Sequence, residues 1–94
     1  PKVDTSANIL LNRAKQGSVR AQYNLGLKYL KGESVPRDKA EAYSWFNLAA
    51  VSSKNAKAQR DRLGKQLSPS ARQLAERRST NLYKQIEVRK KAGK

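Results

Sequence analysis

The sequence contains no cysteine, histidine or methionine among its 94 residues. Zinc, copper, haem and iron–sulfur centres therefore lack their usual ligands, and cysteine or histidine catalysis lacks its reactive groups. No disulfide framework can form either, which leaves the redox compartment of the protein open. We expect no metal site and no cofactor.

Acidic residues are scarce as well, and long apolar runs are absent. Seven Asp and Glu stand against 21 Lys and Arg, so the chain has a formal charge of +14. Seven scattered carboxylates make a poor cage for a hard cation, and no apolar run is long enough to span a membrane. The chain begins at Pro1, so we expect a processed protein or a piece of a longer one, and a targeting segment upstream would lie outside it.

The positive charge is concentrated in the second half of the chain. Residues 1–50 hold eight basic and four acidic residues, net +4, whereas residues 51–94 hold thirteen and three, net +10. Such a surface attracts nucleic acid, anionic lipid, acidic polysaccharide or an acidic protein face. The candidates for binding a polyanion are Lys57, Arg60, Arg62, Arg72, Arg77, Arg78 and Lys84.

The apolar residues repeat with the period of an α-helix almost throughout, and strand-like alternation is nearly absent. We predict a single all-helical domain in which residues 19–31 and 37–51 form an antiparallel pair closed by the Gly32–Pro36 loop. Further helices are expected near residues 55–67 and from Ser68 and Pro69 to about Val88. The inward-facing residues of this last helix are predicted to include Leu74 and Leu82.

Residues 21–51, AQYNLGLKYLKGESVPRDKAEAYSWFNLAAV, carry the most specific pattern in the chain. They resemble one unit of the SEL-one-like repeat, a relative of the tetratricopeptide repeat. The matching residues are Ala21, Leu25, Gly26, Tyr29, Gly32, Val35, Asp38, Ala40, Trp45, Ala49 and Ala50. Ser34 departs from the pattern, because the family usually has a second glycine in this loop.

The resemblance implies a short right-handed α-α solenoid of about five helices in antiparallel pairs, ending in a long basic capping helix. Residues 5–16 would be a helix of a partial preceding repeat, and residues 19–51 a complete repeat. Residues 54–88 would be a divergent repeat with its C-terminal cap, followed by a basic tail at 89–94. Trp45 and Tyr29 are expected to be core residues at family packing positions.

The resemblance also implies a function: a scaffold that binds another protein through the concave face lined by the first helix of each pair. The exposed polar residues on that helix are Asn24, Lys28 and Lys31. If the echo of Ala21-Gln22 at Ala58-Gln59 sets the register, Asp61 and Lys65 continue the face. The positive charge favours an acidic partner. Bacterial members of the family are often exported, which favours a periplasmic or secreted location over the cytoplasm.

Two other classes of function remain as alternatives. Charge-driven binding of nucleic acid needs little beyond the basic second half, although no base-reading motif appears and Tyr83 is its only aromatic residue. An enzyme is the weakest alternative, because no residue pair offers an activated nucleophile or a general base. Ser68, for example, is explained as a helix N-cap. We expect no catalytic residues.

Overall fold

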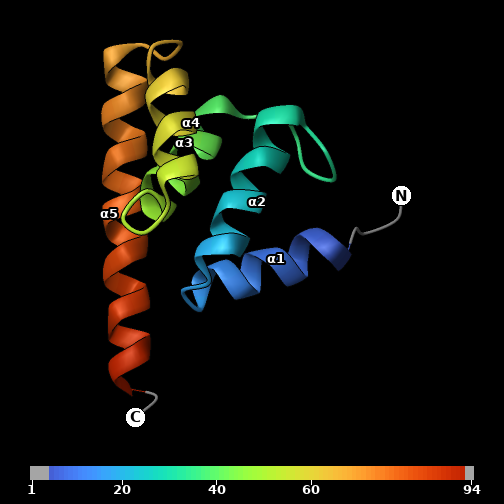
Figure 1. Cartoon of the computed structure of the whole chain (residues 1–94), viewed down its shortest axis with the longest axis vertical. Helices are drawn as coiled ribbons and strands as arrows, with labels where there is room; N and C mark the ends of the chain where they lie inside the picture. Colours follow the sequence, from blue (N-terminus) through green and yellow to red (C-terminus); the bar gives the residue numbers. More distant parts are fainter. Residues whose placement is uncertain (1–4, 93–94) are drawn as a thin grey trace.

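The computed structural model describes residues 5–92, which form five α-helices and, over that range, no strand. The helices are α1 (Thr5–Lys15), α2 (Val19–Lys31), α3 (Lys39–Ala49), α4 (Lys54–Gly64) and α5 (Pro69–Ala92). The chain is all-α, as the helical periodicity predicts, and its last helix is the longest (Figure 1).

Four of the five helices begin in the same way. Ser18, Asp38, Ser53 and Ser68 precede α2, α3, α4 and α5, and each side-chain oxygen accepts a hydrogen bond from the backbone N–H three residues later at 3.0–3.1 Å. A capping oxygen satisfies one of the free N–H groups in the first turn of a helix. The helix starts are therefore fixed by single residues.

The start of α3 differs from the prediction. The helix is predicted to begin at Arg37, but it begins at Lys39. The reason is the carboxylate of Asp38, which accepts the N–H of Glu41 and so makes Asp38 the N-cap and not a residue of the first turn. The Asp38 N–H itself bonds to the Tyr29 carbonyl at 2.9 Å and ties the loop to α2.

The α2–α3 loop places two residues in the left-handed region of backbone space. Gly32 ends α2 with a φ of 74° and donates its N–H to the Lys28 carbonyl at 2.7 Å. Ser34 has a φ of 68°, a conformation that glycine adopts without strain and other residues adopt at a cost. The loop therefore keeps the backbone of a two-glycine turn, although the second glycine is missing.

Helices α2 and α3 form the predicted antiparallel pair, and they approach closely because Gly26 has no side chain. A Cβ built on Gly26 would lie 2.6 Å from the Phe46 ring, closer than real Cβ contacts allow. The same ring contacts Tyr23, with 5.6 Å between the ring centroids. The small residue on α2 thus makes room for the large one on α3.

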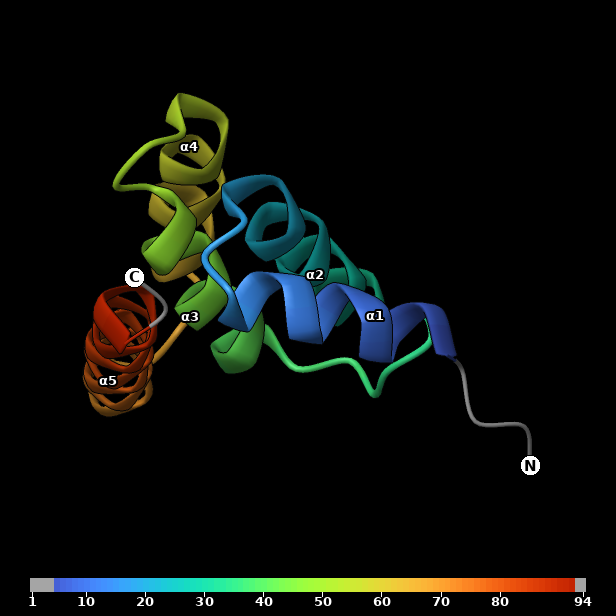
Figure 2. The ribbon, with the colours of Figure 1, turned by 90° about the horizontal axis from the view of Figure 1, so that it is seen from below.

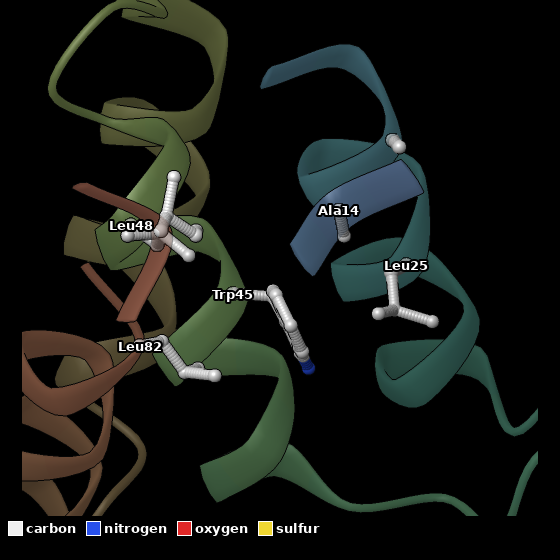
Figure 3. Close-up of a cluster of buried hydrophobic side chains, with 7 residues drawn as sticks. Ala14, Leu25, Trp45, Leu48 and Leu82 are labelled. Carbon is white, nitrogen blue, oxygen red and sulfur yellow. The ribbon is translucent and has the colours of Figure 1, made fainter. Parts of the chain in front are cut away.

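Helix α3 is buried on opposite sides and lies at the centre of the fold (Figure 2). Trp45 points from α3 into one apolar cluster with Ala14 of α1, Leu25 of α2 and Leu82 of α5 (Figure 3). Phe46 belongs to a second cluster, which includes Leu63 of α4. Trp45 and Phe46 are both wholly buried, so the prediction that Trp45 is a core residue is confirmed.

Helix α5 runs along α3 and reaches back to α1 (Figures 1 and 2). Three α3 side chains anchor it with hydrogen bonds: Tyr43 to the Glu76 carboxylate, Ser44 to the Ala75 carbonyl, and Asn47 to the Ser79 hydroxyl. Further along, Leu82 and Ile86 join the apolar cluster of α1 and α2. This helix therefore connects the last part of the chain to the first.

The C-terminal half departs from the prediction at two helix ends and in the burial of one residue. Helix α4 ends at Gly64 instead of Leu67, and α5 continues to Ala92, so residues 89–92 of the predicted basic tail are helical. Residues 93–94 lie outside the described range. Leu74 was expected to face inward, but it is 64% exposed, because the face of α5 that packs on α3 is the one with Ala75 and Ser79.

We predict that Trp45→Ala lowers the free energy of unfolding by about 3–5 kcal/mol, the usual cost of emptying a large aromatic core site. Trp45→Phe is the matched control. It keeps an aromatic ring and removes the indole Nε1, which is buried with no hydrogen-bond partner among the described residues. Its loss should be less than half as large. Urea denaturation measures both, and a loss below about 1 kcal/mol for Trp45→Ala would contradict the central position of this residue.

We predict that Ser34→Gly stabilises the protein by up to about 1 kcal/mol, because glycine adopts the left-handed backbone conformation of this position without strain. The gain is partly offset, because glycine also raises the conformational entropy of the unfolded chain. Gly32→Ala is the opposite test in the same loop. It places a Cβ on a residue with a φ of 74°, 3.1 Å from the Arg37 Cβ, and should destabilise by about 1–2 kcal/mol. Thermal melts of the two variants should move in opposite directions, and equal shifts would contradict the loop geometry.

Candidate interaction surfaces

The polar stripe of α2 is positioned by the helix pair. Asn24, Lys28 and Lys31 are spaced so that they share one side of the helix; the first two are half-buried and Lys31 is exposed. Neither lysine has an ion-pair partner in residues 5–92. Asn24 also lines a shallow hollow between α1 and α2 with Arg13 and Arg20. The sequence prediction omitted these two arginines, because the position of α1 beside α2 is a tertiary feature.

Asp61 and Lys65 do not lie at the positions that correspond to the α2 stripe when α2 and α4 are matched by their N-caps. Ala21 and Ala56 are both buried, and each donates its N–H to the serine that caps its helix. The caps therefore match Ala21 with Ala56, two residues before the Ala58 used for the sequence echo. Matched in this way, Lys28 corresponds to Leu63, which is buried in the core. Of the three stripe positions, Lys28 thus has an apolar counterpart, whereas Asn24 corresponds to Gln59 of α4 and Lys31 to Gln66, just after α4.

Two of the seven candidate polyanion-binding residues are held in ion pairs. Arg78 of α5 forms a two-pronged bridge to Glu41 of α3, with Nε to Oε1 at 2.7 Å and Nη2 to Oε2 at 2.8 Å. These hydrogen bonds are the main reason that the pKa of Arg78 is raised further above its ordinary value. Arg60 pairs with Asp61 at 2.9 Å, so part of the charge in both places is neutralised within the chain.

The other five candidates are exposed and have no ion-pair partner among the described residues: Lys57, Arg62, Arg72, Arg77 and Lys84. They lie on α4 and α5. Arg77 lines a polar hollow with Lys15 of α1, and the paired Arg78 lies on the same hollow. The proximity of Lys15 to the α5 cations follows from the return of α5 to α1.

A chain of polar side chains joins α4, α3 and α5. Arg60 donates from Nη1 to the Asn47 Oδ1 at 3.1 Å, and Asn47 donates from Nδ2 to the Ser79 hydroxyl at 2.7 Å. Ser79 in turn donates to the Glu76 carbonyl at 2.8 Å. These three side chains also line a groove of about 360 Å³ at the C-terminal end of α3, which includes Val51 and Tyr83. The sequence reasoning missed this groove.

Two tyrosines have hydroxyls that are harder to ionise than usual. Burial raises the pKa of Tyr43, and the hydrogen bond from its hydroxyl to Glu76 at 3.0 Å raises it further. Burial also raises the pKa of Tyr29, followed by the negative charge of Glu41. Both groups are therefore neutral at physiological pH, and Tyr43 acts as a hydrogen-bond donor between α3 and α5.

Within residues 5–92, no group of three or more acidic side chains is placed to hold a metal ion. Across the same range, no helix has both the length and the apolar character needed to cross a bilayer.

The family model of the Sel1 repeat matches residues 19–50, which is α2, its loop and α3, about a third of the chain. The match thus covers the two helices of the closely packed pair. Comparison with curated proteins and with solved structures gives no match.

We predict that the protein loses stability as the pH rises above about 10, where an unshifted tyrosine ionises. In the folded state the pKa of Tyr43 is raised, so the unfolded state ionises first and becomes favoured with rising pH. Tyr43→Phe should weaken this dependence and cost about 1 kcal/mol at neutral pH through the lost bond to Glu76. Tyr83→Phe, at a 45% exposed site, is the control. Urea denaturation gives the free energy of unfolding at each pH. If it fell equally steeply above pH 10 in the parent and both variants, Tyr43 would not be the source of the alkaline loss of stability.

Proposed function

Residues 19–50 form a Sel1 repeat, and on this premise we propose that the protein is a non-enzymatic scaffold that binds an acidic partner protein through the polar face of α2. Sel1 repeats are commonly protein–protein interaction modules and typically have no catalytic role. The proposal goes further, because it names the surface and the charge of the partner.

The observation that carries the proposal is that the two lysines on the polar face of α2 have no carboxylate partner in the described chain. These residues, Lys28 and Lys31, lie on a helix whose other sides are occupied by the core. Arg13 and Arg20 extend this positive face around Asn24 toward α1. Unpaired cations on one face give an acidic partner a directed approach and raise the rate of encounter.

The rigidity of α2 supports the same interpretation. Gln22 is buried and donates from Nε2 to the Ala14 carbonyl at 3.1 Å, which fixes α2 against the end of α1. Leu25 and Gly26 hold it against α3. A face on a rigid helix loses little conformational entropy when a partner binds. Asp61 and Lys65, on and just after α4, are secondary candidates, since the cap register does not continue the stripe to them.

Charge-driven binding of nucleic acid or another polyanion is the alternative. It is favoured by the five unpaired cations on α4 and α5 and by the net charge of +10 in residues 51–94. Such binding should be indifferent to sequence and should fall steeply as salt rises. The α2 proposal and this alternative therefore assign binding to different helices, and charge reversals can separate them.

We predict that Lys28→Glu with Lys31→Glu weakens the capture of acidic proteins from a nuclease-treated lysate by about tenfold or more, because a reversed rim charge repels the partner. The melting temperature should fall only slightly: Lys31 is exposed and Lys28 half-buried, and both changes place a negative charge in the last turn of α2, where the helix dipole disfavours it. Lys57→Glu with Arg62→Glu on α4 is the matched control, with the same change in net charge, and it should leave capture nearly intact.

The opposite pattern would contradict the scaffold proposal. If the α4 pair abolishes capture, the α2 pair does not, and duplex DNA competes at low salt but not at high salt, the polyanion alternative is the better account. Capture of every parent partner by the α2 variant would mean that this face is only solvated.

A further inference from the structure

The groove at the C-terminal end of α3 lies where α4 and α5 diverge. Both helices pack on α3, from different sides (Figure 2). Asn47, Leu48 and Val51 line the groove from α3 and the turn after it, Arg60 lines it from α4, and Thr80 and Tyr83 line it from α5. The hydrogen bonds from Arg60 to Asn47 and from Asn47 to Ser79 fix the spacing of α4 and α5 here. The groove is therefore held open by contacts within the fold.

The exposed surface of this groove is apolar at one end. Val51 is 71% exposed and Tyr83 is 45% exposed, two of the five large apolar residues that are exposed in the described chain. Both also line a second hollow, which continues along α5 as far as Lys90. The stretch of α5 from Thr80 to Lys90 is about 15 Å long, at 1.5 Å per helical residue. A helical segment of about ten residues fits this length.

Positive charge exceeds negative charge around the apolar part: Arg60 and Lys90 are paired with Asp61 and Glu87, and Lys84 has no ion-pair partner in residues 5–92. The Arg60 guanidinium has five N–H donors, and within the described chain its bonds to Asp61 and Asn47 use only three of them. Lys84 lies one turn after Thr80 on α5. A second copy of this chain, itself at +14, would be repelled. The complementary occupant is acidic.

We propose that this groove binds an acidic amphipathic helix of a partner protein. Its apolar side chains would cover Val51 and Tyr83, and a carboxylate would take the free donors of Arg60. A groove between helices with apolar anchors and a charged rim suits an amphipathic helix, which is a recurrent way of recognising peptides. The proposal needs a protein ligand, as the proposed function does, but it concerns a different face from that of Lys28 and Lys31.

The test is a selection from a random library of peptides of about 16 residues, displayed on phage and panned on the full chain at about 0.15 M salt. We expect enriched peptides to be acidic, with apolar residues three or four apart. For the tightest peptide, synthesised with a fluorescent label, amide shifts on binding should centre on residues 47–51 and 79–83. Its Kd, from fluorescence anisotropy, should rise at least about tenfold in Val51→Asp and in Tyr83→Ala.

Three controls separate binding in the groove from general charge effects and from misfolding. The Lys28→Glu, Lys31→Glu variant should bind the peptide within about threefold of the parent, although it removes more positive charge than Val51→Asp. Tyr83→Phe should retain most of the binding, because the anchor is the ring. Melting curves should show that Val51→Asp folds normally, as expected at an exposed position.

Several results would overturn the proposal. They are no enrichment, enrichment of acidic peptides without helical apolar spacing, or amide shifts that centre on α2. A DNA duplex that shifts the groove amides when no selected peptide does would assign the groove to a polyanion. None of these results contradicts the α2 proposal. That proposal fails only if charge reversal on α2 leaves partner capture unchanged.

Discussion

The burial of α3 on opposite sides is the constraint on which the other helices depend. Trp45 and Phe46 are adjacent in the sequence but point into different apolar clusters, so α3 must be covered from both sides. On one side α2 supplies Leu25 and α1 supplies Ala14; on the other, α4 supplies Leu63. The large apolar area removed from water at α3 is the main driving force for assembling the five helices.

The polar edge of α3 decides where α5 lies. A side chain as buried as Tyr43 cannot leave its hydroxyl unpaired without a cost of about 1–3 kcal/mol, and its partner, Glu76, is on α5. The Ser44 hydroxyl has acceptors at 3.1 Å in both helices, the Ala40 carbonyl of α3 and the Ala75 carbonyl of α5. Asn47 repeats the arrangement with Ser79 one turn further on. Helix α5 is therefore held in register by hydrogen bonds at one end and by Leu82 and Ile86 at the other.

The same packing leaves most of the charge free. Three ion pairs join charged side chains of the described residues, and only the Arg78–Glu41 pair joins residues far apart in the chain. A rigid helical body with unpaired cations is suited to attracting acidic partners, since stability comes from the core and the surface charges remain available. The α2 face and the groove at the C-terminal end of α3 differ in chemistry: the first is polar, and the second exposes the apolar side chains of Val51 and Tyr83.

Local signals in the sequence determined the helices and the central pair. Serine caps, Gly32 and the spacing of Trp45 and Phe46 act within a few residues, so the α2–α3 unit and its buried tryptophan were predictable from the chain alone. The predicted start of α3 at Arg37 placed Asp38 inside the helix, whereas Asp38 is its N-cap, because a carboxylate serves equally well at the cap or in the first turn. The tertiary structure alone decided the exposure of Leu74 and the groove beside Val51. These depend on the direction of α5, which is set by contacts with α1 and α3 more than thirty residues away in the sequence, and no local pattern records such contacts.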